Sequence, residues 1–191
     1  MTDRTATTAA LAVPLADGEV RVVPFAAHHA APLLRACEED RAIWEIYPVN
    51  MLADDAETML ARFHGEAGWV RFALMQGGHL VGTSCYINPD PENGTVMIGG
   101  TYIAPSVRGT GFNRRVKTLL IDQAFACGFR RVEFTVDTRN GRSLAAMRKL
   151  GAVQEGVMRK NRVTWTGYVR DTALFSILAG EWGASAGEGG R

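Results

Sequence analysis

The 191-residue sequence has little of what marks several specialised classes of protein. Its three cysteines are odd in number and show no CxxC spacing, so neither a disulfide framework nor a metal site is indicated. The net charge of +1 excludes a global attraction to nucleic acid or to an anionic membrane. No apolar run approaches the ~20 residues that a membrane-spanning helix needs. These absences predict reduced, buried thiols, no metal, and no nucleic-acid or membrane partner.

The two ends of the chain differ in composition from the rest. Residues 1–18 are rich in Thr and Ala and are interrupted by Pro14, which makes a poor signal peptide. We expect them to form a flexible segment. Residues 183–191 are rich in Gly, Ala and Ser and are expected to be a disordered tail. The sequence therefore predicts one cytoplasmic domain over residues 19–182.

The hydrophobic periodicity alternates between that of strands and that of helices. Strands are expected at 19–25, 69–75, 79–87, 95–103, 131–136, 152–159 and 168–178, and helices at 27–40, 54–66, 111–127 and 140–150. Antiparallel hairpins thus lead into one strand–helix–strand crossover, which is expected to be parallel and right-handed. The predicted fold class is a single α/β domain. It has a mixed, mostly antiparallel twisted sheet, helices on both faces, and one parallel crossover.

The chemistry concentrates at the start of the long predicted helix, in Arg108-Gly109-Thr110-Gly111-Phe112-Asn113. Glycines let the backbone turn tightly and approach a ligand. The first N–H groups of a helix lack internal partners and carry the positive end of its dipole. Arg108, Arg114, Arg115 and Lys117 surround this end where acids would be favourable, so an anion such as a pyrophosphate is expected there.

Other interpretations of this loop stay open at this point. A glycine-rich turn with a solvated face of cations would look similar, because short glycine motifs are weak signals. A P-loop would need a Gly-Lys-Ser/Thr ending that is missing here. A dinucleotide site would need a third glycine near Arg114, although Asp137 at the end of the next strand keeps that idea open.

The loop and the residues after it resemble the GCN5-related N-acetyltransferases, in the branch of the ribosomal-protein acetyltransferases. Arg108, Gly111 and Asn113 occupy the cofactor-motif positions, with Asn at a place that is usually Gly or Ala. A subgroup of that branch also has Asn there, with Lys at the place of Lys117. The resemblance covers roughly residues 20–182, and its further matches are Asn140, Ser143, Lys149-Leu150-Gly151-Ala152, Glu155-Gly156-Val157, Arg159, Arg170-Asp171-Thr172, Phe175-Ser176-Ile177-Leu178 and Glu181-Trp182.

The resemblance implies acetyl-CoA as co-substrate and a place for each part of it. In that fold the strand before the loop splays from the next strand, and the pantetheine arm enters between them. Gly99-Gly100 suits a bulge in the first of these strands. The implied cofactor-binding residues are Thr101, Tyr102, Ile103, Arg108, Gly109, Thr110, Gly111, Phe112, Asn113, Arg114, Asn140 and Ser143.

The catalytic residues are less well marked than the cofactor loop. The resemblance implies that Ser143 hydrogen-bonds the departing thiolate and that Asn140 contacts the cofactor, although Asn140 also suits an ordinary N-cap. Met97 stands where many relatives carry a glutamate base, so that role is empty or has moved. Glu45, between Trp44 and Tyr47 in the segment that lines the acceptor groove of similar proteins, is the candidate base. A rim carboxylate beside core aromatics is the alternative.

These observations predict an N-acetyltransferase that acts on a primary amine. Without a strong base, acceptors that deprotonate easily are favoured, such as a protein N-terminal α-amine (pKa about 7.7–8.0) or a small amine, over lysine at about 10.4. The alternative function is a catalytically silent acyl-CoA-binding sensor or interaction protein. Residues 175–182 offer apolar surface for a homodimer.

Overall fold

The computed structural model describes residues 6–183 of the chain. Its elements agree with the predicted order of strands and helices, because the periodicity of each segment is strong. The strands are β1 (Leu15–Asp17), β2 (Val20–Pro24), β3 (Trp69–Gln76), β4 (His79–Asp90), β5 (Thr95–Ile103), β6 (Arg131–Asp137), β7 (Val153–Val163) and β8 (Val169–Leu178). The α-helices are α1 (Ala30–Glu38), α2 (Ala56–Gly65), α3 (Phe112–Ala126) and α4 (Gly141–Leu150).

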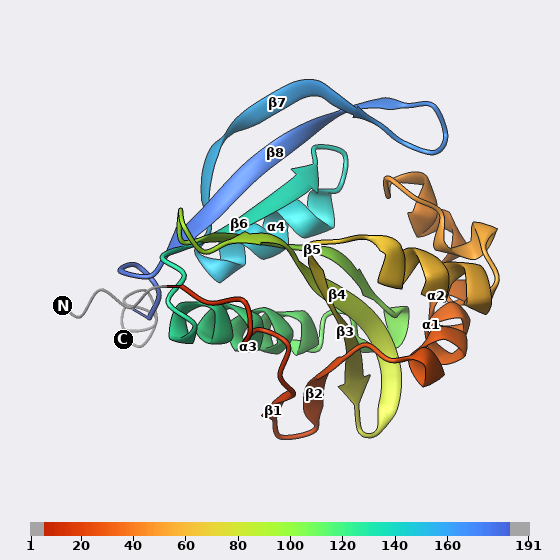
Figure 1. The fold of residues 1–191 in the computed structure, drawn as a ribbon. Coiled ribbons are helices and arrows are strands. Elements are labelled where there is room, and N and C mark those ends of the chain that lie inside the picture. Colours follow the sequence, from red (N-terminus) through yellow and green to blue (C-terminus); the bar gives the residue numbers. More distant parts are fainter. Residues whose placement is uncertain (1–5, 184–191) are drawn as a thin grey trace.

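The eight strands form one sheet in the order β1-β2-β3-β4-β5-β6-β8-β7 (Figure 1). Every neighbouring pair is antiparallel except β5 and β6, which are parallel and joined through α3. This confirms the predicted fold class, a mixed and mostly antiparallel sheet with one parallel crossover. The carboxyl ends of β5 and β6 therefore point to the same edge of the sheet.

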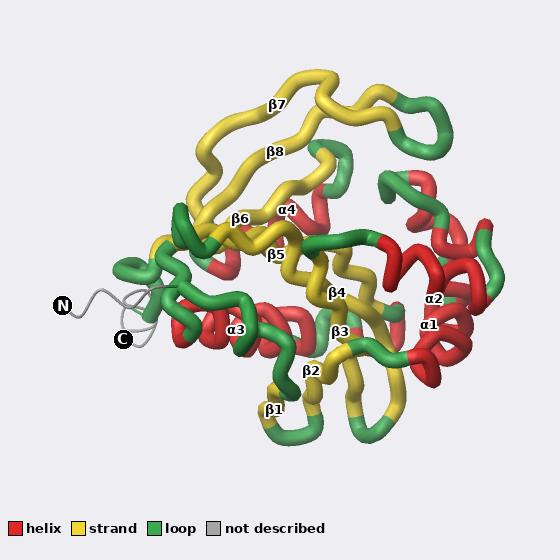
Figure 2. Tube along the Cα trace, viewed as in Figure 1, coloured by secondary structure: helices red, strands yellow, loops and turns green. Residues whose placement is uncertain are grey.

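Helices cover both faces of the sheet (Figure 2). Two tyrosines contact these helices from the sheet. Tyr86 of β4 donates a hydrogen bond to the carbonyl of Leu120 in α3, while Tyr102 of β5 donates to the carbonyl of Ala36 in α1. Both rings are almost fully buried, and they project from opposite faces. Each hydroxyl thus satisfies a helix carbonyl while its ring contributes to the core.

Strand β5 carries the glycine bulge that the sequence predicted. Between the pairs Thr83–Tyr102 and Cys85–Gly99, one residue of β4 faces two residues of β5. Gly100 adopts a φ of +57°, and a Cβ there would lie 3.1 Å from the Cys85 sulfur. Only glycine adopts this positive φ and allows this close approach to Cys85 without strain. The bulge bends β5 at the level where it leaves its parallel partner.

The N-terminal segment differs from the flexible one that we expected. Residues 15–17 form β1 and pair with β2, and Leu11 is fully buried. Gln123 of α3 holds the carbonyl of Ala10 through a hydrogen bond of 2.8 Å. The ordered domain therefore begins before residue 19, because the apolar side chain in this short run packs into the core. Residues 184–191 of the expected tail lie outside the described residues.

Strand β8 does not present the apolar surface that we expected. Phe175 and Ile177 are buried in the core, so the run from residue 175 to 182 is not the apolar dimer surface that we expected. The two residues are two positions apart on β8, so their side chains project from the same face of the sheet into the core. Within residues 6–183, no helix is both long and apolar enough to cross a membrane.

Candidate active site

The candidate site lies where β5 and β6 diverge. The two strands pair only over three residues each, from Thr95–Arg131 to Met97–Glu133. Beyond Met97, the edge of β5 that faces β6 has no strand partner among the described residues. The connection to α3 and the start of α4 both lie at this edge. Ligands of α/β proteins commonly bind at such a point, outside the carboxyl ends of parallel strands.

The cofactor loop has the backbone shape expected of an anion site. Gly109 and Gly111 adopt φ values of +79° and +86°, and a Cβ on either would meet no atom within 4 Å. Open space therefore surrounds this backbone. Helix α3 begins after Gly111 with no capping side chain and no acid in its first turn. The N–H groups of Asn113 and Arg114 in its first turn are thus available to a bound anion, whereas that of Phe112 donates to the Thr110 hydroxyl at 3.4 Å.

Not every N–H group of the loop is available, which corrects part of the expectation. The Arg108 N–H donates to the carbonyl of Pro105 at 3.1 Å, in a short 3-10 turn. Phe112 is almost fully buried, so its side chain contributes to the core while only its backbone lies in the first helical turn. Thr110 uses its hydroxyl to hold the carbonyl of Val107 at 2.8 Å.

The cations around the start of α3 are also arranged differently from the expected cluster. Arg108 forms an ion pair with Asp40 and donates through Nε to the Ile103 carbonyl at 2.8 Å. The hydrogen bond from Arg108 lowers the pKa of Asp40 below its ordinary value. Arg115 pairs with Asp17. Three of the four cations therefore have protein partners, and Arg114 alone is exposed without one among the described residues.

Lys117, the fourth cation, is buried, with only 4% of its surface exposed. Its Nζ lies 2.6 Å from the hydroxyl oxygen of Thr101 and 3.3 Å from that of Ser84. Those two oxygens lie 2.7 Å apart. The helical period could have shown this placement, because Lys117 follows Val116 and precedes Leu120 and Ile121 on the buried side of α3. Sequence reasoning missed it because lysine is rarely buried.

The backbone after the bulge is held by side chains from both sides. Tyr47 donates a hydrogen bond of 2.6 Å to the carbonyl of Thr101, and burial raises its pKa to about 12. The carbonyl of Ile103 accepts from Arg108. Ala104 donates to the carbonyl of Val81 on β4 at 2.8 Å. Thr101, Tyr102 and Ile103 thus form a rigid edge opposite β6, and Tyr47 is a site residue that sequence reasoning missed.

Helix α4 starts at the same edge of the sheet, just after β6. Asn140 is its N-cap, and the side-chain oxygen of Asn140 accepts from the Ser143 N–H at 3.1 Å. The ordinary capping role of Asn140 is therefore present. Its side-chain nitrogen is left for another partner. Ser143 lies on the first turn of α4, and among the described residues its hydroxyl makes no hydrogen bond.

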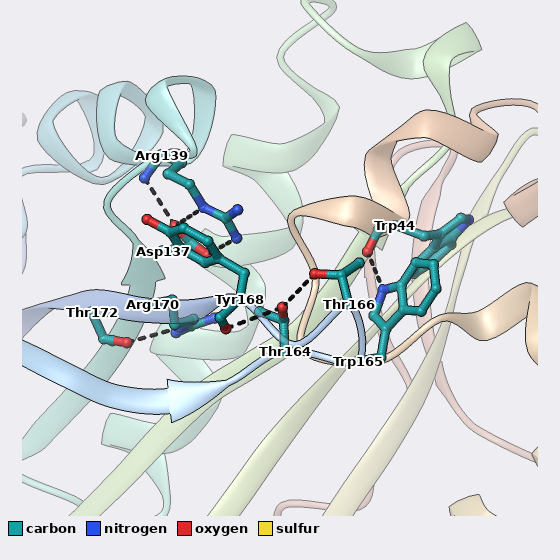
Figure 3. A network of polar contacts seen from close by, with 9 residues as sticks. All are labelled: Trp44, Asp137, Arg139, Thr164, Trp165, Thr166, Tyr168, Arg170 and Thr172. Carbon is teal, nitrogen blue, oxygen red and sulfur yellow. Dashed lines mark hydrogen bonds and ion pairs between the residues drawn. The ribbon is translucent and has the colours of Figure 1, made fainter.

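Two loops far apart in the sequence meet beside Tyr102 of β5, and Figure 3 shows the contact between them. The indole N–H of Trp165, in the β7–β8 connection, donates to the carbonyl of Trp44 at 2.7 Å. Trp44 lies in the 3-10 helix η2 (Arg41–Glu45), and its ring stacks on Tyr102 at 4.9 Å. Glu45, the candidate base, ends that helix and is exposed. Among the described residues, no hydrogen bond joins Glu45 to Ser143 or to any other side chain.

The remaining acid near this edge is already paired. Asp137 is buried at the end of β6 and binds the guanidinium of Arg139, with Oδ2 and Nη2 2.8 Å apart. Tyr168 lies over that guanidinium at 3.7 Å from ring centroid to Cζ (Figure 3). Asp137 therefore does not present the free carboxylate that would read a dinucleotide ribose. Met97, the residue at the usual base position, receives only a weak 3.7 Å contact from the Thr135 hydroxyl. No group of three His, Cys, Asp or Glu side chains within the described part of the chain could hold a metal ion.

Comparisons with known proteins agree with this geometry. The family described as acetyltransferase (GNAT) domain matches residues 19–153. A structure from T. thermophilus that is assigned as an acetyltransferase is 35% identical, with a TM-score of 0.77, covering 88% of this chain and 90% of its own. A structure from Chromobacterium violaceum assigned to the same family is 29% identical, with a TM-score of 0.85 and coverage of 95% and 99%. RimJ from Mycobacterium smegmatis, in complex with CoA-disulfide, shares 22% identity and the fold, with a TM-score of 0.78 and coverage of 89% and 88%.

Proposed function

The chain belongs to the acetyltransferase (GNAT) family, and we propose that it moves an acetyl group from acetyl-CoA directly to a primary amine. The acceptor is a protein N-terminal α-amine or a small-molecule amine, and the reaction takes place in the cytoplasm. The similarity to the ribosomal-protein acetyltransferase branch supports this assignment.

One observation carries the proposal. β5 and β6 separate next to helix α3, whose N-cap residue Gly111 has no capping side chain, so the N–H groups of Asn113 and Arg114 are not capped. The pyrophosphate of acetyl-CoA would bind the backbone from Gly109 to Arg114, where the positive φ values of Gly109 and Gly111 leave room for it. The side-chain oxygen of Asn113 is buried and has no partner among the described residues, so it can accept a hydrogen bond from the pantetheine amides.

The chain's own residues then position the reaction. Acetyl-CoA supplies the activated carbonyl; transfer forms the carbon–nitrogen bond and breaks the carbon–sulfur bond. The edge of β5 from Thr101 to Ile103, which has no strand partner among the described residues, would orient the acetyl carbonyl through backbone N–H groups, since the Thr101 and Ile103 carbonyls already have partners. Ser143 is proposed to donate to the departing sulfur, which takes one proton while the amine gives up one. Asn140 would contact the cofactor through its free side-chain nitrogen.

The acceptor class follows from the weakness of the available base. Met97 cannot accept a proton, and Glu45 is exposed to solvent at the rim. An acceptor must therefore lose its proton largely to water, which favours an α-amine over a lysine side chain. The test compares acetylation of two peptides of the same sequence, one with a free N-terminal α-amine and one with a free lysine side chain as its only amine. Acetylation of the lysine peptide alone would overturn it.

A second candidate function is an acyl-CoA-binding protein without activity, which the methionine at the base position favours. Thiol release from acetyl-CoA in the presence of an amine panel separates the two candidates. The enzyme is expected to release CoA with at least one amine, with matching mass increase of the acceptor. A silent binder would be protected against heat by acetyl-CoA and would release no CoA.

A further inference from the structure

Lys117 carries a buried amine that the proposed reaction does not yet use. It lies one helical turn after Asn113 on α3, and its side chain reaches under the bulge of β5. No carboxylate pairs with it among the described residues; it contacts two hydroxyls, and its Nζ lies 5.9 Å from the centroid of the Phe134 ring on β6. Burying a lysine without an acid is costly, so such a residue is rare in a core.

The donors and acceptors around this amine form one consistent chain. Lys117 donates to both Ser84 of β4 and Thr101 of β5, whose hydroxyl oxygens lie 2.7 Å from each other. If Ser84 donates to Thr101, the Thr101 hydroxyl is left to donate to the carbonyl of Gly99, 3.4 Å away. Together these bonds span the bulge, from Gly99 on one side to Thr101 on the other, and tie it to α3 and β4.

We propose that Lys117 is a positioning residue for acetyl transfer: through Ser84 and Thr101, its amine holds the β5 bulge in the shape that presents the backbone of residues 101–103. This inference rests on the proposed function, since that backbone is the part of the chain expected to orient the acetyl carbonyl. Among the described residues no strand supports the β6 side of this edge, because β6 does not pair with β5 beyond Met97. Tyr47 and Arg108 hold the Thr101 and Ile103 carbonyls, whereas Lys117 and its two hydroxyl partners act on the bulge itself.

The charge of the amine makes the role testable. Burial lowers the pKa of Lys117 to about 7, so the amine titrates near neutral pH. Cys85 on β4 is the titratable group that faces it, and burial raises the pKa of that thiol to about 12, so the thiol stays neutral. Within the described part of the chain, β5 and β6 contact the amine through Thr101 and the Phe134 ring, neither of which titrates. Hydrogen bonds from the ammonium are stronger than those from a neutral amine, so the support should weaken as the pH rises through 7.

The first experiment compares the wild-type protein with Lys117→Met, which keeps the length of the side chain but removes the donors. At pH 6 we expect kcat to fall by at least about tenfold, the value of a lost charge-assisted hydrogen bond, with the KM of the amine changed less than about twofold. The ratio of wild-type to variant kcat should shrink between pH 6 and pH 8.5. Lys149→Met, the same change at an exposed lysine of α4, is the matched control and should behave as wild type.

Two results would overturn the proposal. A Lys117→Met kcat within twofold of the control would show that the amine does not support the bulge. A loss that is the same at every pH would show that the charge of the amine plays no part in holding the bulge. If Lys117→Met does not fold, Ser84→Ala carries the test. It leaves the amine in place and should lower kcat about threefold to fivefold; an unchanged kcat would contradict the network.

A second readout does not depend on catalysis. The pKa of Lys117 is lower in the folded chain than its ordinary value of 10.5. Between about pH 7 and 10 the unfolded chain therefore binds more protons, so this group makes stability rise with pH in that window. The wild-type midpoint of unfolding should rise more steeply with pH than that of Lys117→Met. Parallel profiles would contradict the burial of a titrating amine.

Failure of the proposed function and failure of this inference can be told apart. If the wild-type protein binds acetyl-CoA but transfers the acetyl group to no amine, the proposed function fails. The role of Lys117 is then measured by calorimetric titration with acetyl-CoA. Lys117→Met should raise the dissociation constant more at pH 6 than at pH 8.5, and an unchanged constant would overturn the inference.

Discussion

The two sides of β5 are built in different ways. On the side of the cofactor loop, one continuous segment from Ala104 to Arg114 supplies a 3-10 turn, two glycines at positive φ and the first turn of α3. On the side where we place the acceptor, the structure joins segments more than a hundred residues apart, since Trp165 of the β7–β8 connection binds the Trp44 carbonyl. Tyr47 connects that second side to the bulge through the Thr101 carbonyl.

This difference suggests how the two sides can change. A local motif depends on a few backbone angles and tolerates variation elsewhere in the chain. An assembled surface depends on the placement of several loops, and loops vary most readily. The proposed cofactor is therefore readable from a short segment, whereas the acceptor is not. Substitutions on one side should change the kinetic constants of one substrate only.

The largest expected effect is on the cofactor side. Gly111→Ala places a side chain at a φ of +86° in the space where the anion would bind. The backbone strain costs about 1–2 kcal/mol, and the new side chain keeps the anion from the backbone. Together they should raise the KM of acetyl-CoA about 30-fold. The KM of the amine should stay the same. Initial rates with each substrate varied in turn measure both constants.

Gly167→Ala is the matched control for that substitution. Gly167 also has a positive φ, +83°, and no atom would lie within 4 Å of its Cβ, but it belongs to the β7–β8 connection beside Trp165. The same strain should there raise the KM of the amine and leave that of acetyl-CoA unchanged. If both glycine variants alter the same constant, the separation of the two sides is wrong.

Tyr47→Phe should have the next largest effect, because it removes one of the bonds that join the two sides; the ion pair of Arg108 with Asp40 is another. The Thr101 carbonyl would lose a 2.6 Å hydrogen bond in a partly buried place. An unsatisfied buried carbonyl costs about 1–3 kcal/mol, so kcat should fall about tenfold. Tyr168→Phe removes a hydroxyl that has no hydrogen bond among the described residues and should not change kcat. Assays of CoA release at saturating concentrations of both substrates measure the kcat of Tyr47→Phe and Tyr168→Phe.

Trp165→Phe should have a smaller effect, confined to the acceptor side. It keeps an aromatic ring but removes the N–H that binds the Trp44 carbonyl at 2.7 Å. Losing one neutral hydrogen bond of about 1 kcal/mol should raise the amine KM about fivefold. Trp182→Phe, which removes the indole bond to Asp122 far from the site, is its control. A rise in the acetyl-CoA KM for Trp165→Phe would count against two separate sides.

The smallest kinetic effect is expected from Glu155→Gln, outside both sides. The hydrogen bonds from Arg131 and Ser176 lower the pKa of Glu155 to about 2, so its stabilising contribution is complete above about pH 4.5 and is lost as the pH falls toward 2. The variant should lose about 1 kcal/mol of unfolding free energy at pH 7, because partial exposure screens the pair. Urea unfolding at several pH values measures this loss, with Glu92→Gln as the control. The rate of acetyl transfer should not change.

Much of the fold was predictable because its elements have strong periodicity. β5 matches the predicted strand from residue 95 to 103, and the glycine bulge lies where the pair Gly99-Gly100 indicated it. The tight turn before α3 was also predictable, since Gly109 and Gly111 act through local backbone angles, while its binding of a cofactor stays a prediction. The prediction of a cation cluster at the start of α3 was wrong. It counted arginines without knowing that Asp40 and Asp17 would reach two of them from distant segments.

The sequence by itself determined the strands, the helices and the loop at the start of α3, because each of these depends on neighbours a few residues apart. Only the tertiary structure decided that Lys117 contacts Thr101 at the bulge, that Tyr47 holds the Thr101 carbonyl, and that Trp165 meets Trp44. Those contacts join residues that are 16, 54 and 121 positions apart in the chain. No local pattern records such pairs, because packing between elements sets them rather than the preferences of any one segment.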